Sequence, residues 1–182
     1  MEIRKLKIDG TYEIKPKKIG DSRGYFAETY REDIFFEHGL QTKWVQENQS
    51  LSTRVDTIRG LHFQEPPFAQ SKLVSASLGQ IYDVFVDIRK DSTTFGQWDA
   101  ILLSDELCNS VYIPKGFAHG FCTRTENTIV RYKVDNLYSR EAEKGVRWDD
   151  PKLAIDWNVS QPIVSERDLS MSLFSDLITS FS

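Results

Sequence analysis

Arg59 and His62 are the two side chains of this sequence best placed to do chemistry together. They lie three residues apart in an apolar segment, 58–64, that follows a polar loop and ends before two prolines. If the segment is a β-strand, its side chains alternate between two faces, which puts Arg59 opposite His62 and groups His62 with Gly60 and Gln64. That face has almost no apolar side chain and predicts a polar pocket, where an imidazole could transfer protons near neutral pH. A core histidine bonded to the backbone is the alternative that the segment alone leaves open.

Further polar side chains are expected on other strands of the chain. Gln46 and Asn48 share one face of a strand with Ser50 and form a row of neutral hydrogen-bonding groups. Lys72 begins another alternating segment, and His119 stands between two small residues that would let a ligand approach. Tyr132 lies in a third alternating segment, where an aromatic packed in the core is the default interpretation.

The elements that must position these residues are mostly short strands. The clearest is 81–88, where apolar side chains at even positions alternate with Asp83 and Asp87. These carboxylates could be solvated charges at the edge of a sheet. If cations lie opposite them in a barrel interior, they would be pocket residues instead. A short helix is expected at 32–38, and apolar residues at every fourth position from 169 to 181 predict a helix at the C-terminus. The pattern predicts an all-β, jelly-roll (cupin-like) sandwich or barrel with short peripheral helices and a helical C-terminus.

The composition is that of a globular protein, and we expect one domain over residues 1–182. Hydrophobic residues make up 40% of the chain and the net charge is −4, which argues against a broad nucleic-acid-binding face. Cys108 and Cys122 have neither metal-ligand spacing nor the number needed for a disulfide framework, so we expect free thiols. The N-terminus lacks an apolar signal segment and no run approaches a membrane span, so we expect a cytoplasmic protein without a membrane partner.

Three chemistries could use histidines in a β-barrel. A cupin-type metal site needs several converging ligands, but the sequence has no His-x-His pair, and we expect no metal. Nucleophilic catalysis needs an activated Ser or Cys, but no Gly-x-Ser-x-Gly elbow is present. The third is cofactor-free proton transfer at a carbon next to a carbonyl, which needs a base, a cation for the enolate oxygen and an acid. His62, Lys72 and Tyr132 would supply these roles.

A series of motifs runs along the chain in a characteristic order, at 21–26 (DSRGYF), 46–50 (QENQS), 59–64 (RGLHFQ), 70–74 (QSKLV), 83–89 (DVFVDIR), 113–121 (IPKGFAHGF) and 138–151. With these motifs, the chain from about residue 8 to about residue 170 resembles the dTDP-4-dehydrorhamnose 3,5-epimerase family. The resemblance implies a jelly-roll enzyme that converts dTDP-4-dehydro-6-deoxy-D-glucose to dTDP-4-dehydro-L-rhamnose without a cofactor, by proton transfer at the two carbons flanking the ketone.

The resemblance implies a role for each matching residue. His62 matches the base, Asp168 the carboxylate paired with it, Tyr132 the acid on the opposite face of the sugar, and Lys72 the lysine near the ketone oxygen. Arg167 falls where the family usually has lysine. Positions that match substrate contacts are Gln46, Asn48, Arg59, His119, Glu143 and Tyr138, of which Tyr138 would stack on thymine. An N-terminal segment with Arg23, Phe26 and Glu28 matches one that reaches the partner subunit's active site, which implies a homodimer.

The sequence motifs leave three other functions open. An epimerase acting at only one of the two carbons of another dTDP-4-keto-deoxysugar would share these motifs. A sugar-nucleotide-binding jelly roll without catalysis would bind the substrate but not exchange its protons. A metal-dependent cupin enzyme is a third, weaker alternative.

Overall fold

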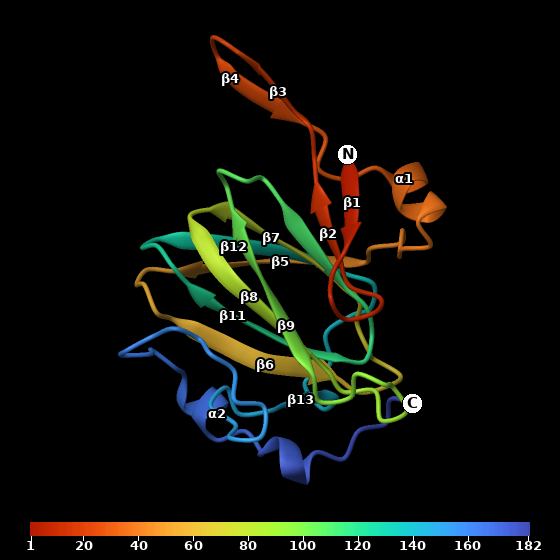
Figure 1. Ribbon diagram of the computed structural model, residues 1–182, viewed down its shortest axis with the longest axis vertical. Helices are drawn as coiled ribbons and strands as arrows, with labels where there is room; N and C mark the ends of the chain where they lie inside the picture. Colours follow the sequence, from red (N-terminus) through yellow and green to blue (C-terminus); the bar gives the residue numbers. More distant parts are fainter.

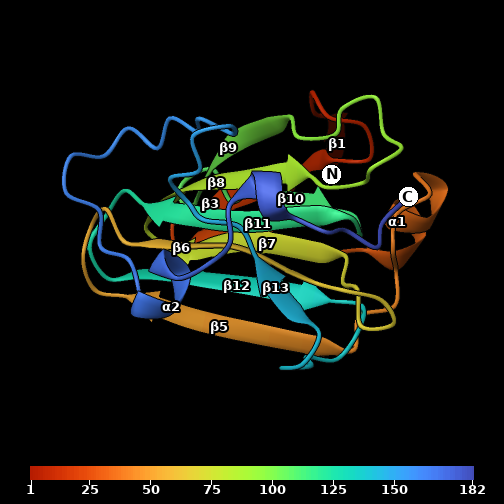
Figure 2. The ribbon, with the colours of Figure 1, turned by 90° about the horizontal axis from the view of Figure 1, so that it is seen from below.

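The computed structural model describes residues 1–182 and is built mainly from two antiparallel β-sheets that lie face to face (Figures 1 and 2). The first sheet has six strands. In spatial order they are β1 (Glu2–Lys5), β2 (Tyr12–Lys15), β10 (Ser110–Ile113), β7 (Lys72–Leu78), β12 (Thr128–Val134) and β5 (Gln46–Ser52).

The second sheet has five strands, and two short helices and a 3-10 turn lie outside the sheets. The strands are β13 (Glu143–Gly145), β6 (Ile58–Gln64), β11 (Phe117–Thr123), β8 (Gln80–Asp87) and β9 (Trp98–Ser104). The helices are α1 (Glu32–Glu37) and α2 (Glu166–Leu169), and the 3-10 turn is η1 (Phe174–Asp176). The predicted β-sandwich and the short peripheral helices are therefore confirmed. Neither helix has the length and hydropathy of a membrane-spanning helix.

The alternation of β8 divides its side chains between two cores. Val84 and Val86 pack outward under the C-terminal segment, whereas Ile81 and Phe85 belong to the apolar core between the sheets. Asp83 and Asp87 share that inner face and are fully buried, so they are not solvated edge charges. The strand predicted at 81–88 is confirmed together with its two faces.

The predicted C-terminal helix is wrong. Only four residues form α2, and the chain beyond it is extended apart from η1. This segment runs across the outer face of the five-stranded sheet, where Phe174, Leu177 and Phe181 pack against the core (Figure 1). Outside η1, its backbone bonds to neighbouring loops, as in the Arg147 N–H to Ser172 carbonyl bond of 3.0 Å. Of the residues at the spacing of four, Leu177 and Phe181 pack against the core, whereas Leu169 is 48% exposed.

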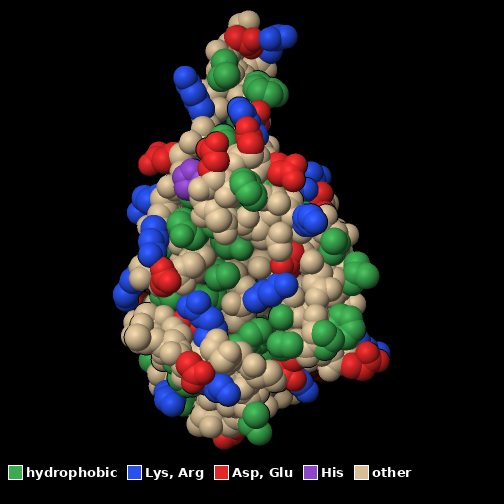
Figure 3. All heavy atoms as spheres, turned by 90° about the vertical axis from the view of Figure 1, so that its right-hand side faces the viewer, with side chains coloured by type: hydrophobic (Ala, Val, Ile, Leu, Met, Phe, Trp, Pro, Cys, Tyr) green, Lys and Arg blue, Asp and Glu red, His purple; other side chains and the backbone are tan.

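An N-terminal hairpin stands away from both sheets. Its strands β3 (Lys18–Asp21) and β4 (Gly24–Ala27) pair only with each other. Figures 1 and 3 show the hairpin projecting as an arm from one end of the molecule. Phe26 is 68% exposed although it is a large hydrophobic side chain. The hairpin therefore presents apolar surface that this chain does not cover.

Candidate active site

A cavity of about 660 Å³ opens between the two sheets. Its walls come from β5, β7 and β12 on one side and from β6, β11 and β13 on the other, with α2 at its edge. Eleven of the predicted site residues line it. They are Gln46, Asn48, Arg59, His62, Lys72, His119, Tyr132, Tyr138, Glu143, Arg167 and Asp168.

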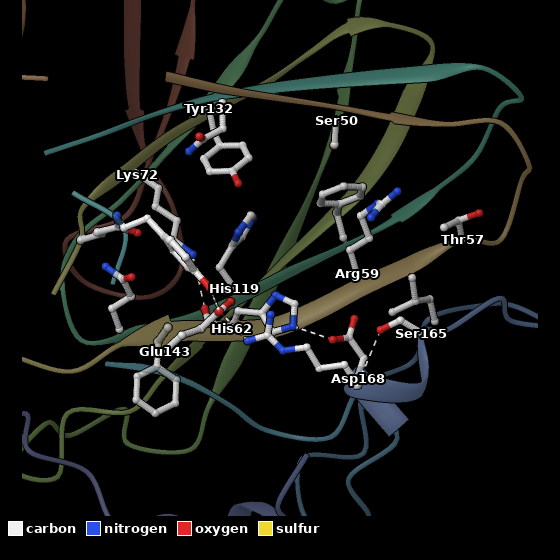
Figure 4. A pocket seen from close by; sticks show the side chains of 18 of the residues that line it. Ser50, Thr57, Arg59, His62, Lys72, His119, Tyr132, Glu143, Ser165 and Asp168 are labelled. Atoms are coloured by element: carbon white, nitrogen blue, oxygen red, sulfur yellow. Dashed lines mark hydrogen bonds and ion pairs between the residues drawn. The ribbon is translucent and has the colours of Figure 1, made fainter. Parts of the chain in front are cut away.

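Arg59 and His62 point into the same cavity, so the prediction of opposite faces is wrong (Figure 4). On β11, His119 and Phe121 are two residues apart, yet their partners on β6 are His62 and Arg59, which are three apart. The extra residue is Gly60, whose φ is +132°. A bulge of this kind resets the alternation of a strand. It places arginine and histidine side by side in the cavity.

His62 and Asp168 form a hydrogen-bonded pair. The Nε2 of His62 lies 2.7 Å from Oδ1 of Asp168, and Oδ2 of Asp168 accepts a bond of 3.2 Å from the Gly60 N–H. Asp168 is held in turn by the start of α2, where its N–H donates to the hydroxyl of the N-cap residue Ser165. Burial would raise the pKa of Asp168, but the bonds from His62 and Gly60 outweigh it, so the pKa is lowered. Asp168 is therefore an anion that orients the imidazole.

Tyr132 faces His62 from the other sheet. It lies on β12, and its hydroxyl points into the cavity toward the histidine side (Figure 4). Burial raises the pKa of Tyr132, as does the nearby Glu143, while Arg59 opposes them. The phenol therefore keeps its proton at neutral pH and can donate it. The sequence-based default of a purely packed aromatic does not describe its position.

Lys72 and His119 line the same cavity. The Nζ of Lys72 donates to the carbonyl oxygen of His62 at 3.3 Å. Burial lowers the pKa of Lys72 to about 8, and the charges of Asp83 and Glu143 limit the decrease. The Nε2 of His119 lies 2.9 Å from Oδ2 of the buried Asp83. A cation and an imidazole thus converge where a substrate oxygen could sit.

Glu143 connects two residues at the cavity mouth. Its Oε2 accepts a 2.6 Å bond from the Tyr138 hydroxyl and lies 2.5 Å from Nη2 of Arg167. Burial would raise the pKa of Glu143, but the bonds with Tyr138 and Arg167 lower it. The carboxylate therefore fixes an aromatic ring and a guanidinium relative to each other.

The predicted residues of the hairpin lie outside this cavity. Arg23, Phe26 and Glu28 do not line it, and the Arg23 side chain is 87% exposed beside Asp21. Conversely, the cavity wall includes Thr57, Ile163 and Val164, which the sequence analysis did not single out. The N–H of Ile58 bonds to the carbonyl of Ile163 at 2.9 Å, a contact between distant segments that has no periodic signal. The one local signal in the sequence is Ser165, directly after this pair, since serine is a preferred N-cap residue.

The arrangement suits proton transfer at a carbon atom. A histidine–aspartate pair on one wall and a neutral phenol on the other can remove and return protons on opposite faces of a bound molecule. Lys72 can stabilise negative charge that develops on an oxygen between them. No group of three or more His, Cys, Asp or Glu side chains is arranged to hold a metal ion.

Comparison with known proteins places the chain in one family. Residues 5–176 match the family described as dTDP-4-dehydrorhamnose 3,5-epimerase. The chain is 48% identical to the enzyme of that name from Methanothermobacter thermautotrophicus, covering 90% of this chain and 89% of the relative. It is 43% identical to the enzyme of the same name from Sinorhizobium fredii, and this match covers 100% of this chain and 93% of the relative.

Solved structures agree with the sequence relatives. The Bacillus anthracis dTDP-4-dehydrorhamnose 3,5-epimerase, solved with TDP and PPi bound, superposes with a TM-score of 0.93 at 44% identity and covers 95% of this chain and 99% of that one. The Legionella pneumophila enzyme, solved in complex with dTDP-4-keto-L-rhamnose, gives 0.92 at 39% identity, with coverage of 97% and 94%.

Proposed function

This chain belongs to the dTDP-4-dehydrorhamnose 3,5-epimerase family and is an epimerase, and we propose that His62, Asp168, Tyr132 and Lys72 carry its chemistry. The observation that supports this assignment is the placement of His62 and Tyr132 on opposite walls of one cavity. The substrate would be dTDP-4-dehydro-6-deoxy-D-glucose and the product dTDP-4-dehydro-L-rhamnose.

Each inversion needs one proton removed and one delivered. The ketone at carbon 4 acidifies the protons on carbons 3 and 5, because the electrons left behind move onto the ketone oxygen. His62 would take the proton from one face, with Asp168 stabilising the imidazolium that forms. Tyr132 would then deliver a proton to the other face of the same carbon. Exchange with solvent restores the proton on Tyr132 and removes the one on His62 before the second inversion.

The oxygen anion at carbon 4 would be stabilised where Lys72 and His119 line the cavity. Lys72 brings a positive charge into a buried site, where electrostatic interactions are stronger than in water. His119 lies beside it and would contribute a second polar contact.

The nucleotide would occupy the outer part of the cavity. Arg59 carries a guanidinium suited to paired bonds with a diphosphate, and Tyr138 offers a ring for stacking on thymine. Arg167 would add a second cation at the mouth. Gln46 and Asn48, whose side chains are hydrogen-bonded at 2.9 Å, would contribute neutral polar contacts.

Proton NMR of dTDP-4-keto-6-deoxyglucose with the enzyme in deuterated water tests the function. We expect loss of signal at both carbon 3 and carbon 5, and a rhamnose product after a reductase is added. Exchange at one carbon alone would indicate a single-carbon epimerase, and binding without exchange would indicate a non-catalytic protein. His62→Ala is the matched inactive control.

We further propose that the active enzyme is a homodimer in which the hairpin reaches the partner's cavity. The hairpin carries exposed Tyr25 and Phe26 and does not contact the cavity of its own chain. Arg23 and Glu28 would then complete the partner's substrate site. We also expect the enzyme to work in the cytoplasm, since Cys108 and Cys122 are free thiols, as is usual in a reducing compartment.

Complementation between two inactive variants tests this exchange. Arg23→Ala and His62→Ala are each expected to lose activity, and co-refolding them would give hybrid dimers. If Arg23 acts on the partner's site, one site of each hybrid has both residues intact, and activity returns. If Arg23 acts within its own chain, every site keeps a defect and no activity returns.

A further inference from the structure

The buried carboxylate of Asp83 is not among the residues assigned above. It lies on β8 and is fully buried. Its neighbours on the same face, Ile81 and Phe85, belong to the apolar core between the sheets. A carboxylate in such surroundings carries a large desolvation penalty unless its charge is compensated. A reason for its presence therefore has to be found nearby.

The hydrogen bond with His119 uses only one of the two oxygens of the Asp83 carboxylate. Oδ2 lies 2.9 Å from Nε2 of His119, but Oδ1 is buried without a hydrogen-bond partner in the protein. A neutral amide oxygen would accept the imidazole N–H equally well. An uncommitted second oxygen indicates that the negative charge itself has a use.

The cation that this charge can serve is Lys72. The titratable groups that face Lys72 are Asp83 on β8, Glu143 on β13, His62 on β6, His119 on β11 and Tyr132 on β12. Two of these groups are carboxylates, and Glu143 is already bonded to Tyr138 and Arg167. Asp83 is therefore the anion with a free oxygen near the lysine.

We propose that Asp83 is a positioning residue that keeps Lys72 in its ammonium form and fixes the ring of His119 against the substrate's carbon 4 oxygen. This inference rests on the proposed role of Lys72 in stabilising that oxygen. Asp83 does not line the cavity, so it acts through these two side chains and not by contact with the substrate.

The pH dependence of the rate gives this role a signature. Burial lowers the pKa of Lys72 to about 8, and the charge of Asp83 opposes that decrease. Without the charge, the pKa of Lys72 falls further, so the ammonium is lost at lower pH. The rate therefore falls at a lower pH, and the alkaline limb of the pH profile moves. A residue that only packs, or only accepts the hydrogen bond of His119, would change the rate or the stability without moving this alkaline limb.

The test is the pH profile of kcat/KM for Asp83→Asn, which keeps the size and an acceptor for His119. We expect the alkaline limb to move to lower pH by about one unit or more, with kcat at pH 8 reduced about tenfold and KM little changed. Asp87→Asn is the matched control, because Asp87 is buried on the same face of β8 but bonds to Arg89, Ser92 and Thr94. Its alkaline limb should stay in place. A folded Asp83→Asn enzyme with an unmoved limb would overturn the inference.

A second comparison separates this inference from the proposed function. In a Lys72→Met background, Asp83→Asn should add little further loss, because the two residues act together. Fully additive losses would show that Asp83 acts independently of Lys72 and would refute the inference alone. Full activity of Lys72→Met would instead refute the role of Lys72, and the inference with it. If Asp83→Asn does not fold, Asp83→Ser removes the same charge from a smaller side chain and carries the same test.

Discussion

His62 and Tyr132 lie on different sheets and face each other across the cavity. The proposed base and the proposed acid are therefore held by two separate sets of backbone hydrogen bonds, and their separation is set by the packing of the sandwich. In the proposed mechanism this relationship turns proton exchange into inversion, since a single group on one wall could only return the proton to the face it came from.

Tyr132→Phe should uncouple exchange from inversion. We expect the rate of epimerisation to fall about 10²–10⁴-fold, because the acid is missing. Exchange of substrate protons with deuterated water should fall much less, because His62 and Asp168 remain. Proton NMR measures both rates in one sample. His62→Ala should lose both, and a Tyr132→Phe enzyme that inverts at the wild-type rate would exclude tyrosine as the acid.

Asp168→Asn should lower kcat about 10²–10⁴-fold without changing the shape of the cavity. The amide can still hold the imidazole, but it no longer stabilises the imidazolium. Initial rates with a coupled reductase measure the loss. Ser165→Ala provides the comparison, because it removes the cap of α2 at a cost of about 1 kcal/mol in stability and leaves the charge of Asp168 in place. An equal loss in both variants would mean that Asp168 acts only by holding the helix.

The same pair should stabilise the fold in a pH-dependent way. The pKa of Asp168 is lowered in the folded chain by its bonds to His62 and Gly60, despite burial. Its contribution is therefore fully present above the unfolded pKa of about 4 and is lost as the pH falls through the folded value. The difference in Tm between wild type and Asp168→Asn should be largest near neutral pH and shrink toward pH 3. A difference that is constant with pH would mean that the charge is not involved.

The β-strands and the identity of the polar residues could be predicted from sequence because both depend on local pattern. The alternation in β8 has a period of two residues and needs no knowledge of the partner strands. The convergence of Lys72, His119 and Tyr132 on one cavity could not be derived from spacing. It depends on the order of β7, β11 and β12 in two sheets, and only the family resemblance indicated it.

The errors have the same physical origin. Arg59 was expected on the opposite face from His62 because alternation assumes a regular ladder, whereas the bulge at Gly60 depends on its contact with Gly120 in another strand. The C-terminal helix was expected because a spacing of four fits one face of a helix. Two of these residues, Leu177 and Phe181, pack instead from an extended chain that crosses a sheet, and tertiary contacts decide between the two arrangements.

The activity should decrease above a pH of about 8 because Lys72 loses its proton. Burial lowers the pKa of Lys72 to about 8, whereas burial raises the pKa of Tyr132, so the lysine is the first of the two to titrate on the alkaline side. Lys72→Arg keeps its charge at all working pH values and should move the limb upward, although its planar head will lower the maximum rate. The profile of kcat/KM between pH 6 and 10 measures both. If the alkaline limb of the Lys72→Arg profile stays at the same pH as in the wild type, the limb belongs to another group.

Gly60 should tolerate no side chain, because the bulge that brings Arg59 into the cavity requires two backbones in contact. A Cβ at position 60 would lie 2.5 Å from Cα of Gly120 and 2.8 Å from the carbonyl oxygen of His119, at a φ of +132°. Gly60→Ala should therefore lose several kcal/mol, about 1–3 from the backbone conformation and a similar amount from the clash. Gly24→Ala is the matched control, since Gly24 has a φ of +128° but no atom within 4 Å of its Cβ position. It should show only the backbone cost. Urea unfolding of the two variants measures the difference, and equal losses would mean that the contact between β6 and β11 relaxes freely and does not define the bulge.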